Sequence, residues 1–187
     1  MNYIPSFIMI LSNEKYSDYK ITKNYLNFIY ALISNPKFNK EISKNMKKLI
    51  EQIINILQSN QNDSVIINSI KEILYILPNK INSDKYFKTI SIYLNDKSDI
   101  ILLQILLGSI KNYIIYDKNK NLERTMTYFI DGVLLLLDYQ SSDIRKSAIY
   151  CCVEMYNILK DKFNIYYERM SKNTQNIINQ LIKKKVG

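Results

Sequence analysis

The stretch that decides the fold is residues 132–160, GVLLLLDYQSSDIRKSAIYCCVEMYNILK. Its apolar first part stops at a short polar turn, residues 138–142, and a second helix is predicted to begin at Asp143. An aspartate at a helix start accepts hydrogen bonds from the free amides of the first turn and interacts favourably with the helix dipole. Apolar residues then recur at helical spacing, at Ile144, Ala148, Cys151, Met155 and Leu159. The stretch therefore predicts a helix hairpin with a tight, capped turn.

Two further stretches have the same plan. Residues 62–77 and 97–110 each start with polar residues that include Asp and Ser, and continue as an apolar-rich helix. Aligning Val65, Ile100 and Ile144 gives separations of 35 and 44 residues. Such periods are typical of helix-hairpin repeats of the HEAT or armadillo kind, in which each hairpin buries its apolar face against the next. We therefore predict an α-solenoid of HEAT-type hairpins.

The composition also favours an all-α fold, because three Gly and three Pro are too few for the many turns of a sheet-rich protein. Helices are expected at residues 2–11, 18–34, 41–58, 62–77, 84–94, 100–116, 122–137, 143–160 and 173–185. Pro36 and Pro78 are expected to end the helices that they follow. A chain of 187 residues can build one sizeable core. We therefore expect residues 1–187 to form a single HEAT-repeat domain that is part of a longer protein.

Neither a signal peptide nor a transmembrane helix is predicted. Residues 1–11 lack the basic leading segment and the cleavage site of a signal peptide. The longer apolar runs are broken by polar residues or are too short to span a bilayer, so membrane insertion is not predicted. The last helix is expected to cap the open end of the stack, with residues 183–185, all Lys, placed favourably at its C-terminal dipole. A basic tail that binds an anion is the alternative interpretation.

The formal net charge of +9 is compatible with an anionic partner. The chain has only three Arg, however, and Arg is the side chain preferred for bidentate phosphate recognition. No dense basic helix and no RNA-reading motif is present, so nucleic-acid binding is not predicted. The competing explanation of the charge is that Lys residues only occupy solvent-exposed positions.

Cys151 and Cys152 are adjacent on one helix, where they are expected to be buried thiols in a reducing compartment.

The residues that most enzymes need are missing from the sequence. The chain has no His, which removes the usual general base and the commonest metal ligand. No Gly-rich loop follows a strand, and the acidic residues Glu72, Asp131 and Glu154 lie on separate predicted helices. We therefore expect a protein that is not an enzyme and has no cofactor and no metal site.

Residues 139–185 resemble the last repeat and the terminal helix of the TOG-type domains of CLASP proteins. The similar features are Ser141-Ser142 before Ile144-Arg145-Lys146, the small Ala148, Tyr150-Cys151, Val153-Glu154-Met155-Tyr156 and Leu181-Ile182-Lys183. Agreement in helix order extends back to about Lys47. The similarity is greatest to the C-terminal TOG domain, which in relatives recruits partners and dimerises. Tubulin-binding TOG domains usually carry a Trp on their first turn, and this chain has no Trp.

The resemblance implies a non-catalytic, microtubule-associated regulator in the cytoplasm, on microtubules or the spindle. The resemblance also implies that such a protein binds tubulin or recruits an adaptor to regulate microtubule dynamics. In the family, the turns inside the repeats line the edge that contacts tubulin, and here they correspond to residues 12–17, 59–63, 95–99 and 139–143. The candidate contact residues that follow are Lys15, Tyr16, Lys97, Tyr139, Arg145 and Lys146. Basic side chains on such an edge would steer the chain to the acidic surface of tubulin. The oligomeric state stays open.

Each candidate also has a structural interpretation. Arg145 lies where HEAT helices use Arg to brace a neighbouring repeat, and Tyr139 can pack back onto Leu136. Lys146 is expected to point outward, either to a partner or only to water, and Lys15 and Lys97 can serve solubility alone. A second hypothesis for the whole chain follows: a general HEAT-repeat scaffold that binds another protein and never meets tubulin.

Overall fold

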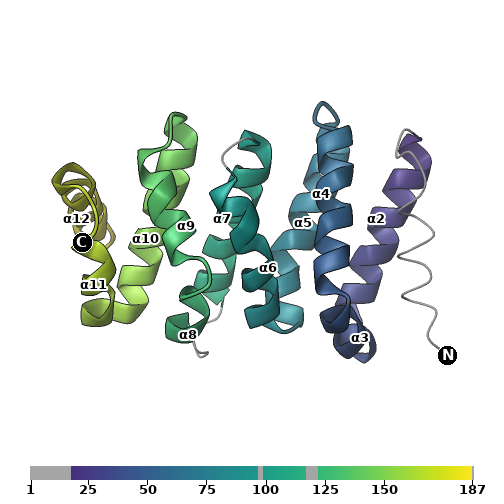
Figure 1. Cartoon of the computed structure of the whole chain (residues 1–187), viewed down its shortest axis with the longest axis horizontal. Coiled ribbons are helices and arrows are strands. Elements are labelled where there is room, and N and C mark those ends of the chain that lie inside the picture. Colours follow the sequence, from purple (N-terminus) through teal and green to yellow (C-terminus); the bar gives the residue numbers. More distant parts are fainter. Residues whose placement is uncertain (1–17, 97–98, 117–121, 187) are drawn as a thin grey trace. The chain divides into compact units, whose positions relative to one another are not determined.

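The computed structural model describes residues 18–96, 99–116 and 122–186, and within these ranges the chain is all helical, with turns and no strand (Figure 1). The prediction of an all-α fold is confirmed. The expected helix 2–11 lies outside the described residues. The chain divides into two compact units, Met1–Ile90 and Ser91–Gly187, which are considered separately below. None of the described helices combines the length and the apolar character needed to cross a membrane.

The first unit is built from α2 to the first part of α6. Its helices are α2 (Tyr19–Ser34), the short 3-10 helix η1 (Pro36–Phe38), α3 (Asn39–Lys44), α4 (Met46–Ser59), α5 (Ser64–Lys80) and α6 (Ser83–Asn95), the last of which crosses into the second unit. α2 and α4 both pack against α5, and α3 lies at the lower end of α4 in Figure 1. The buried apolar side chains of this unit include Tyr25, Leu26, Ile29, Ile33, Ile50, Ile53, Ile70, Leu74 and Leu77.

Aspartate caps start two of these helices, as the pattern of Asp before an apolar run suggests. Asp18 Oδ1 accepts from the amides of Lys20 at 2.8 Å and Ile21 at 3.2 Å. Asp63 Oδ1 likewise accepts from the first amides of α5, at 2.9 and 3.1 Å. In α2 the buried side chains include Thr22, Tyr25, Leu26 and Ile29, whereas Ile21 and Phe28 are exposed.

Two of the expected helix boundaries in the first unit are wrong. The helix expected at 41–58 is broken at Asn45, whose side-chain amide donates to the carbonyl oxygen of Glu41 at 3.0 Å and so ends α3. Pro36 does follow the end of α2, but Pro78 lies inside α5 and the helix continues past it. Proline has no N–H to donate to the carbonyl of Leu74, four residues back. The buried hydroxyl of Tyr86 in α6 donates to that carbonyl oxygen at 3.1 Å, so a tertiary contact supplies a donor that the helix lacks.

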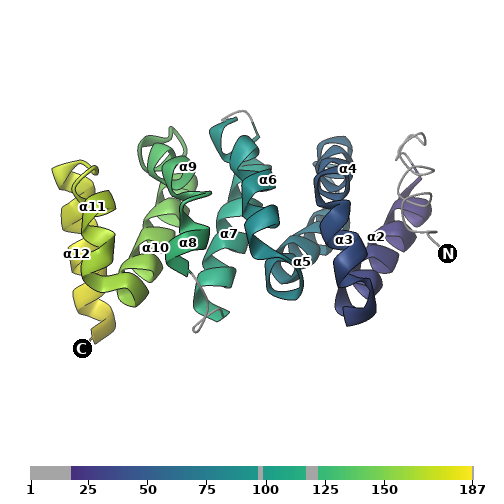
Figure 2. The same cartoon turned by 60° about the horizontal axis from the view of Figure 1, so that its bottom comes forward.

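The second unit is centred on α10. It contains α7 (Ile100–Tyr116), α8 (Leu122–Met126), α9 (Ile130–Leu135), η2 (Leu136–Asp138), α10 (Ser142–Leu159), η3 (Lys160–Phe163), α11 (Asn164–Tyr167) and α12 (Lys172–Val186). α7 and α10 lie side by side in both views, and α12 also packs on α10 (Figures 1 and 2). The predicted inward positions Ile144, Ala148, Cys151 and Met155 are buried, and Leu159 is half-buried.

The helix expected at 122–137 is broken into α8, α9 and η2 by a turn at residues 127–129. The break allows α9 to approach α6 closely at Gly132, where an added Cβ would lie 2.7 Å from the Cβ of Leu94. Only glycine fits this crossing without a shift of one helix. The last helix, expected at 173–185, is confirmed as α12, and Ile178 is its fully buried residue.

Candidate partner-binding turn

The turn between η2 and α10 is one of two predicted contact turns whose residues are all described, the other being residues 59–63. The chain leaves η2 at Tyr139 in an extended conformation (φ −67°, ψ 153°) and enters α10 at Ser142. Asp143 does not cap this helix, as the sequence had suggested, but lies in its first turn after Ser141 at the cap position. The acidic side chain is still well placed for the helix dipole.

Arg145 holds this turn in place. Its Nη1 atom donates to the carbonyl oxygens of Tyr139 and Gln140, both at 2.7 Å. Hydrogen bonds from a charged donor to two consecutive carbonyl groups are short and strong. The guanidinium is half-buried and its described bonds are to the turn in its own hairpin. Of the two interpretations, bracing is supported, although the braced element is its own turn and not a neighbouring repeat.

Lys146 and Tyr139 differ in how far they are available to a partner. The side chain of Lys146 is 70% exposed, and its Nζ lies 3.9 Å from the Asp143 carboxylate, a long and solvated pair. The outward direction predicted for Lys146 is therefore confirmed. Tyr139 is half-buried against the turn. A rigid turn thus presents one exposed cation and one partly exposed aromatic ring.

The other predicted contact residues cannot be placed relative to this turn. Lys15, Tyr16 and Lys97 lie outside the described residues, as does the turn at 12–17. The turn at 59–63 is fully described and contains no Lys or Arg. There, Asn60 donates to the carbonyl oxygen of Ile56 at 2.8 Å and Asp63 caps α5. This turn offers amide and carboxylate groups to a partner and no cation.

The two cysteines are buried free thiols, as predicted. Burial raises the pKa of Cys151 to about 12, and it also raises the pKa of Cys152 well above its ordinary value. Cys151 Sγ donates to the carbonyl oxygen of Leu107 in α7 at 3.3 Å. A thiol of such high pKa stays protonated at neutral pH and is a poor nucleophile. Among the described residues, no group of three or more His, Cys, Asp or Glu side chains could hold a metal ion.

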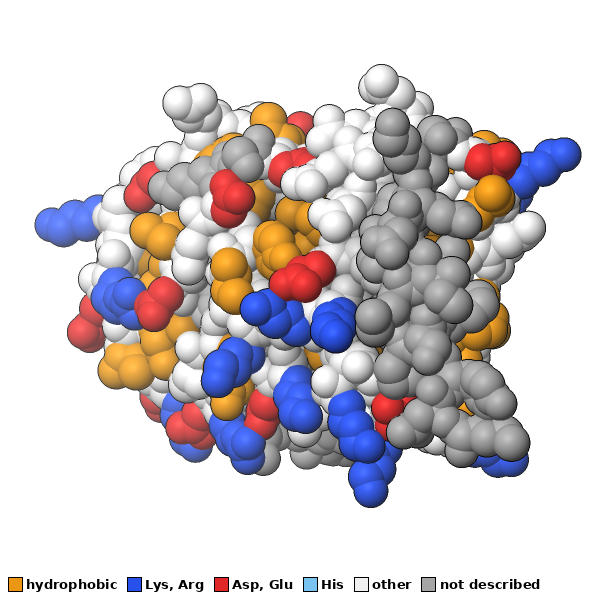
Figure 3. All heavy atoms as spheres, turned by 45° about the vertical axis from the view of Figure 1, so that its right-hand side comes forward, with side chains coloured by type: hydrophobic (Ala, Val, Ile, Leu, Met, Phe, Trp, Pro, Cys, Tyr) orange, Lys and Arg blue, Asp and Glu red, His pale blue; other side chains and the backbone are white. Residues whose placement is uncertain are grey.

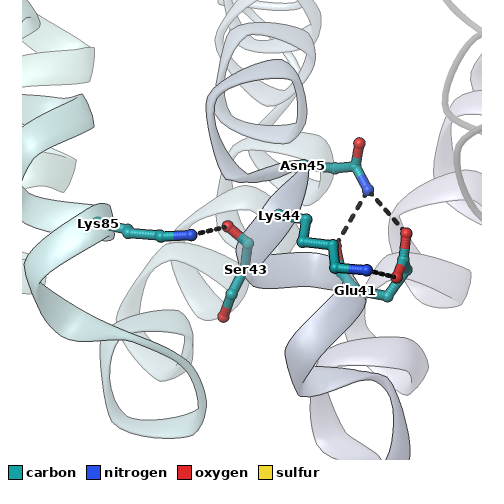
Figure 4. A network of polar contacts seen from close by, with 5 residues as sticks. All are labelled: Glu41, Ser43, Lys44, Asn45 and Lys85. Carbon is teal, nitrogen blue, oxygen red and sulfur yellow. Dashed lines mark hydrogen bonds and ion pairs between the residues drawn. The ribbon is translucent and has the colours of Figure 1, made fainter.

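A second charged surface, which the sequence interpretation did not single out, lies at the other end of the α4–α5 hairpin. The amide N of Asn82 lies 3.5 Å from Ser43 Oγ, and Lys85 Nζ donates to the Ser43 carbonyl oxygen at 3.4 Å (Figure 4). These contacts place the start of α6 beside the end of α3. We call the surface the lysine end and define it by Lys37, Lys40, Lys44, Lys47, Lys48, Lys80, Lys85 and Lys88, all exposed.

Figure 3 shows Lys and Arg side chains gathered over the lower part of the face that it draws, with fewer acidic side chains among them. The sequence did contain a signal for part of the lysine end, because residues 36–48 hold five Lys and one acidic residue. The sequence did not show that the lysines of residues 80–88 join this surface, because that depends on the start of α6 lying next to α3.

Comparison of the chain with protein-family models gives no match, and comparison with curated proteins gives none either.

Proposed function

We propose that this chain is a non-catalytic protein-binding domain of the microtubule-associated CLASP type. In this proposal its hairpins form an α-solenoid of HEAT repeats, and the hairpin turns bind tubulin or an adaptor protein that regulates microtubule dynamics. The domain would act in the cytoplasm, on microtubules or the spindle.

The observation that carries the proposal is the turn braced by Arg145. Two 2.7 Å hydrogen bonds fix the backbone of Tyr139 and Gln140, so a partner need not order this turn when it binds. Preorganisation of this kind reduces the entropy cost of association. Lys146 stands one helical turn into α10 with its ammonium group in solvent, where it would attract an acidic partner such as tubulin.

The test is co-migration of the chain with unpolymerised tubulin in size-exclusion chromatography at low and moderate salt. We expect a complex that weakens as salt rises, because exposed charges are screened. Charge reversal by Lys97→Glu with Lys146→Glu should abolish co-migration. A matched variant, Lys172→Glu with Lys184→Glu, makes the same change in net charge on α12 and should leave co-migration in place.

Circular dichroism melting of both variants tests whether they are folded. Co-migration that survives the Lys97 and Lys146 reversal would reject the assignment of the hairpin turns. If the folded wild-type chain forms no complex with tubulin even at low salt, tubulin binding itself is rejected.

A general HEAT-repeat scaffold that does not bind tubulin is the second candidate function, and two observations favour it. The Arg145 guanidinium is engaged by its own turn, and the described turn at residues 59–63 has no cation. These features leave fewer basic groups on the described turns than an acidic partner would favour. Under this candidate, folded protein gives no salt-sensitive tubulin complex.

A further inference from the structure

The lysine end gathers positive charge from four parts of the first unit. Lys37 and Lys40 come from η1 and α3, Lys47 and Lys48 from the first turn of α4, and Lys80 from the last turn of α5. The first turns of α6 add two more lysines, and the contacts of Ser43 hold those turns beside α3. The surface is therefore a product of the tertiary structure and not of one basic helix.

Some of this charge is already paired within the chain. Lys44 Nζ lies 3.2 Å from the Glu41 carboxylate, and Lys47 Nζ lies 3.8 Å from Glu51. Exposed pairs of this kind contribute little to stability, so the ammonium groups remain available to exchange partners. Lys37, Lys40, Lys48 and Lys80 make no ion pair with the residues that the structure describes.

The two ends of the α4–α5 hairpin differ in charge. The turn at residues 59–63 has no basic side chain and includes Asp63, whereas the opposite end of the same two helices carries Lys47, Lys48 and Lys80. If Lys only filled solvent-exposed positions, lysines should not favour one end of the hairpin in this way. Like charges at close range also repel one another, which is a cost that a bound anionic partner would remove.

The chemistry of this surface favours an acidic polypeptide over nucleic acid. Residues 36–88 contain no Arg, the side chain that best matches the geometry of phosphate. Glu41, Glu51 and Asp84 lie among the lysines, and they would repel the dense, continuous charge of a phosphate backbone. Within residues 36–48 and 80–88 the aromatic rings offer little exposed surface: Phe38 is half-buried, and Tyr86 and Phe87 are buried. Bases would find no stacking platform here.

We propose that the lysine end docks an extended acidic segment of a partner protein, one in which Asp or Glu alternates with uncharged residues. Lys side chains are flexible point charges, so they can follow a carboxylate pattern without a fixed fork geometry. This docking is separate from the contact proposed for the hairpin turns, and it holds or fails independently of tubulin binding.

The experiment is fluorescence anisotropy of the full chain with a labelled peptide of alternating Glu and Ser. A peptide of alternating Gln and Ser is the neutral control. The lysine-end variant carries Lys37→Glu, Lys40→Glu and Lys48→Glu. These three lysines are chosen because none of them makes an ion pair with a residue that the structure describes. Lys40 and Lys48 lie in first turns of helices, where Glu is favourable.

The control variant carries the same change of charge on α12, as Lys172→Glu, Lys183→Glu and Lys184→Glu. We expect the wild-type chain to bind the acidic peptide in a salt-sensitive way and the neutral peptide not at all. The lysine-end variant should lose about tenfold or more in affinity, and the control variant less than about threefold. If either variant melts early, the corresponding Lys→Gln triples replace it, with a smaller expected difference in the same direction.

Three results would overturn the proposal. Equal losses in the two variants would show that only net charge matters. Absence of salt-sensitive binding by the folded wild-type chain would exclude the docking surface. Tighter binding of a single-stranded oligonucleotide, lost in the lysine-end variant, would assign this surface to nucleic acid instead.

Discussion

The hydroxyl of Tyr86 should matter for stability because of a proline in a different helix. Pro78 cannot donate to the carbonyl of Leu74, and the Tyr86 hydroxyl donates to that oxygen at 3.1 Å in the core of the first unit. The substitution Tyr86→Phe removes the donor and keeps the ring, including its edge-to-face contact with Phe87 at 5.0 Å between centroids. Because a typical intramolecular hydrogen bond contributes about 1 kcal/mol net, we expect the loss of this buried bond to lower the free energy of unfolding by about that amount.

The second part of the prediction is that this cost depends on Pro78. In Pro78→Ala the new backbone N–H can donate to the Leu74 carbonyl, as in any regular helix. Tyr86→Phe should then cost about 1 kcal/mol less than in the wild-type background, which is a coupling typical of groups that share one hydrogen bond. The stability of Pro78→Ala itself has two opposing contributions, since proline disfavours a helix interior but also restricts the unfolded chain. Only the coupling tests the reasoning.

The measurement is urea unfolding followed by far-UV circular dichroism for the wild type, the two single variants and the double variant. Because the chain has two compact units, the free energies of the four proteins can be compared only if their free energies of unfolding fall with urea concentration at the same slope (m value). Equal costs of Tyr86→Phe with and without Pro78, within about 0.3 kcal/mol, would refute the role of the hydroxyl as a replacement donor.

Two further predictions concern the second unit. Gly132→Ala should destabilise the chain by roughly 1–3 kcal/mol in the same urea assay, because the new Cβ meets the Cβ of Leu94, which no rotamer change can move. The control is Gly108→Ala, in the partly exposed middle of α7, which should be neutral or stabilising. A thiol reagent at mildly alkaline pH should leave Cys151 and Cys152 unmodified in the folded chain and modify both in urea. Rapid modification of the native protein would contradict the burial of the two thiols. Because the folded chain holds the thiol protons of Cys151 and Cys152 more tightly than the unfolded chain, the free energy of unfolding should also fall as the pH rises from about 9 towards 12.

Local signals in the sequence accounted for most of the helices and for little of their detail. The helix starts expected at residues 18 and 62 lie within two residues of the first residues of α2 and α5, which Asp18 and Asp63 cap, since a cap depends only on neighbouring residues. The cap expected at Asp143 was wrong, because Ser141 takes the cap position of α10. The break at Asn45 was also a local event, and Asn as a helix-ending residue could have indicated it. Pro78 was different: proline in a helix depends on tertiary compensation, and the donor comes from Tyr86 in the next helix.

The candidate site was predicted less well than the fold for the same physical reason. The sequence identified Arg145 as important but could not show that its guanidinium would bond to the carbonyl groups of Tyr139 and Gln140. The exposure of Lys146 followed from helical periodicity alone and was predicted correctly. The lysine end needed the contact between α3 and α6, which join sequence positions about forty residues apart.

Within the first unit, a hairpin turn and the lysine end are far enough apart to act separately. They lie at opposite ends of α4, whose 14 residues at about 1.5 Å each make a helix about 20 Å long. That length is about twice the distance over which exposed charges interact at physiological salt. Reversing Lys37, Lys40 and Lys48 therefore leaves the potential at the turn 59–63 almost unchanged. A partner that contacts only the turn at residues 59–63 should be insensitive to this reversal, and an acidic segment that contacts only the lysine end should be insensitive to changes at that turn. A partner that responds both to this reversal and to changes at the turn 59–63 would have to be long enough to follow α4 from end to end.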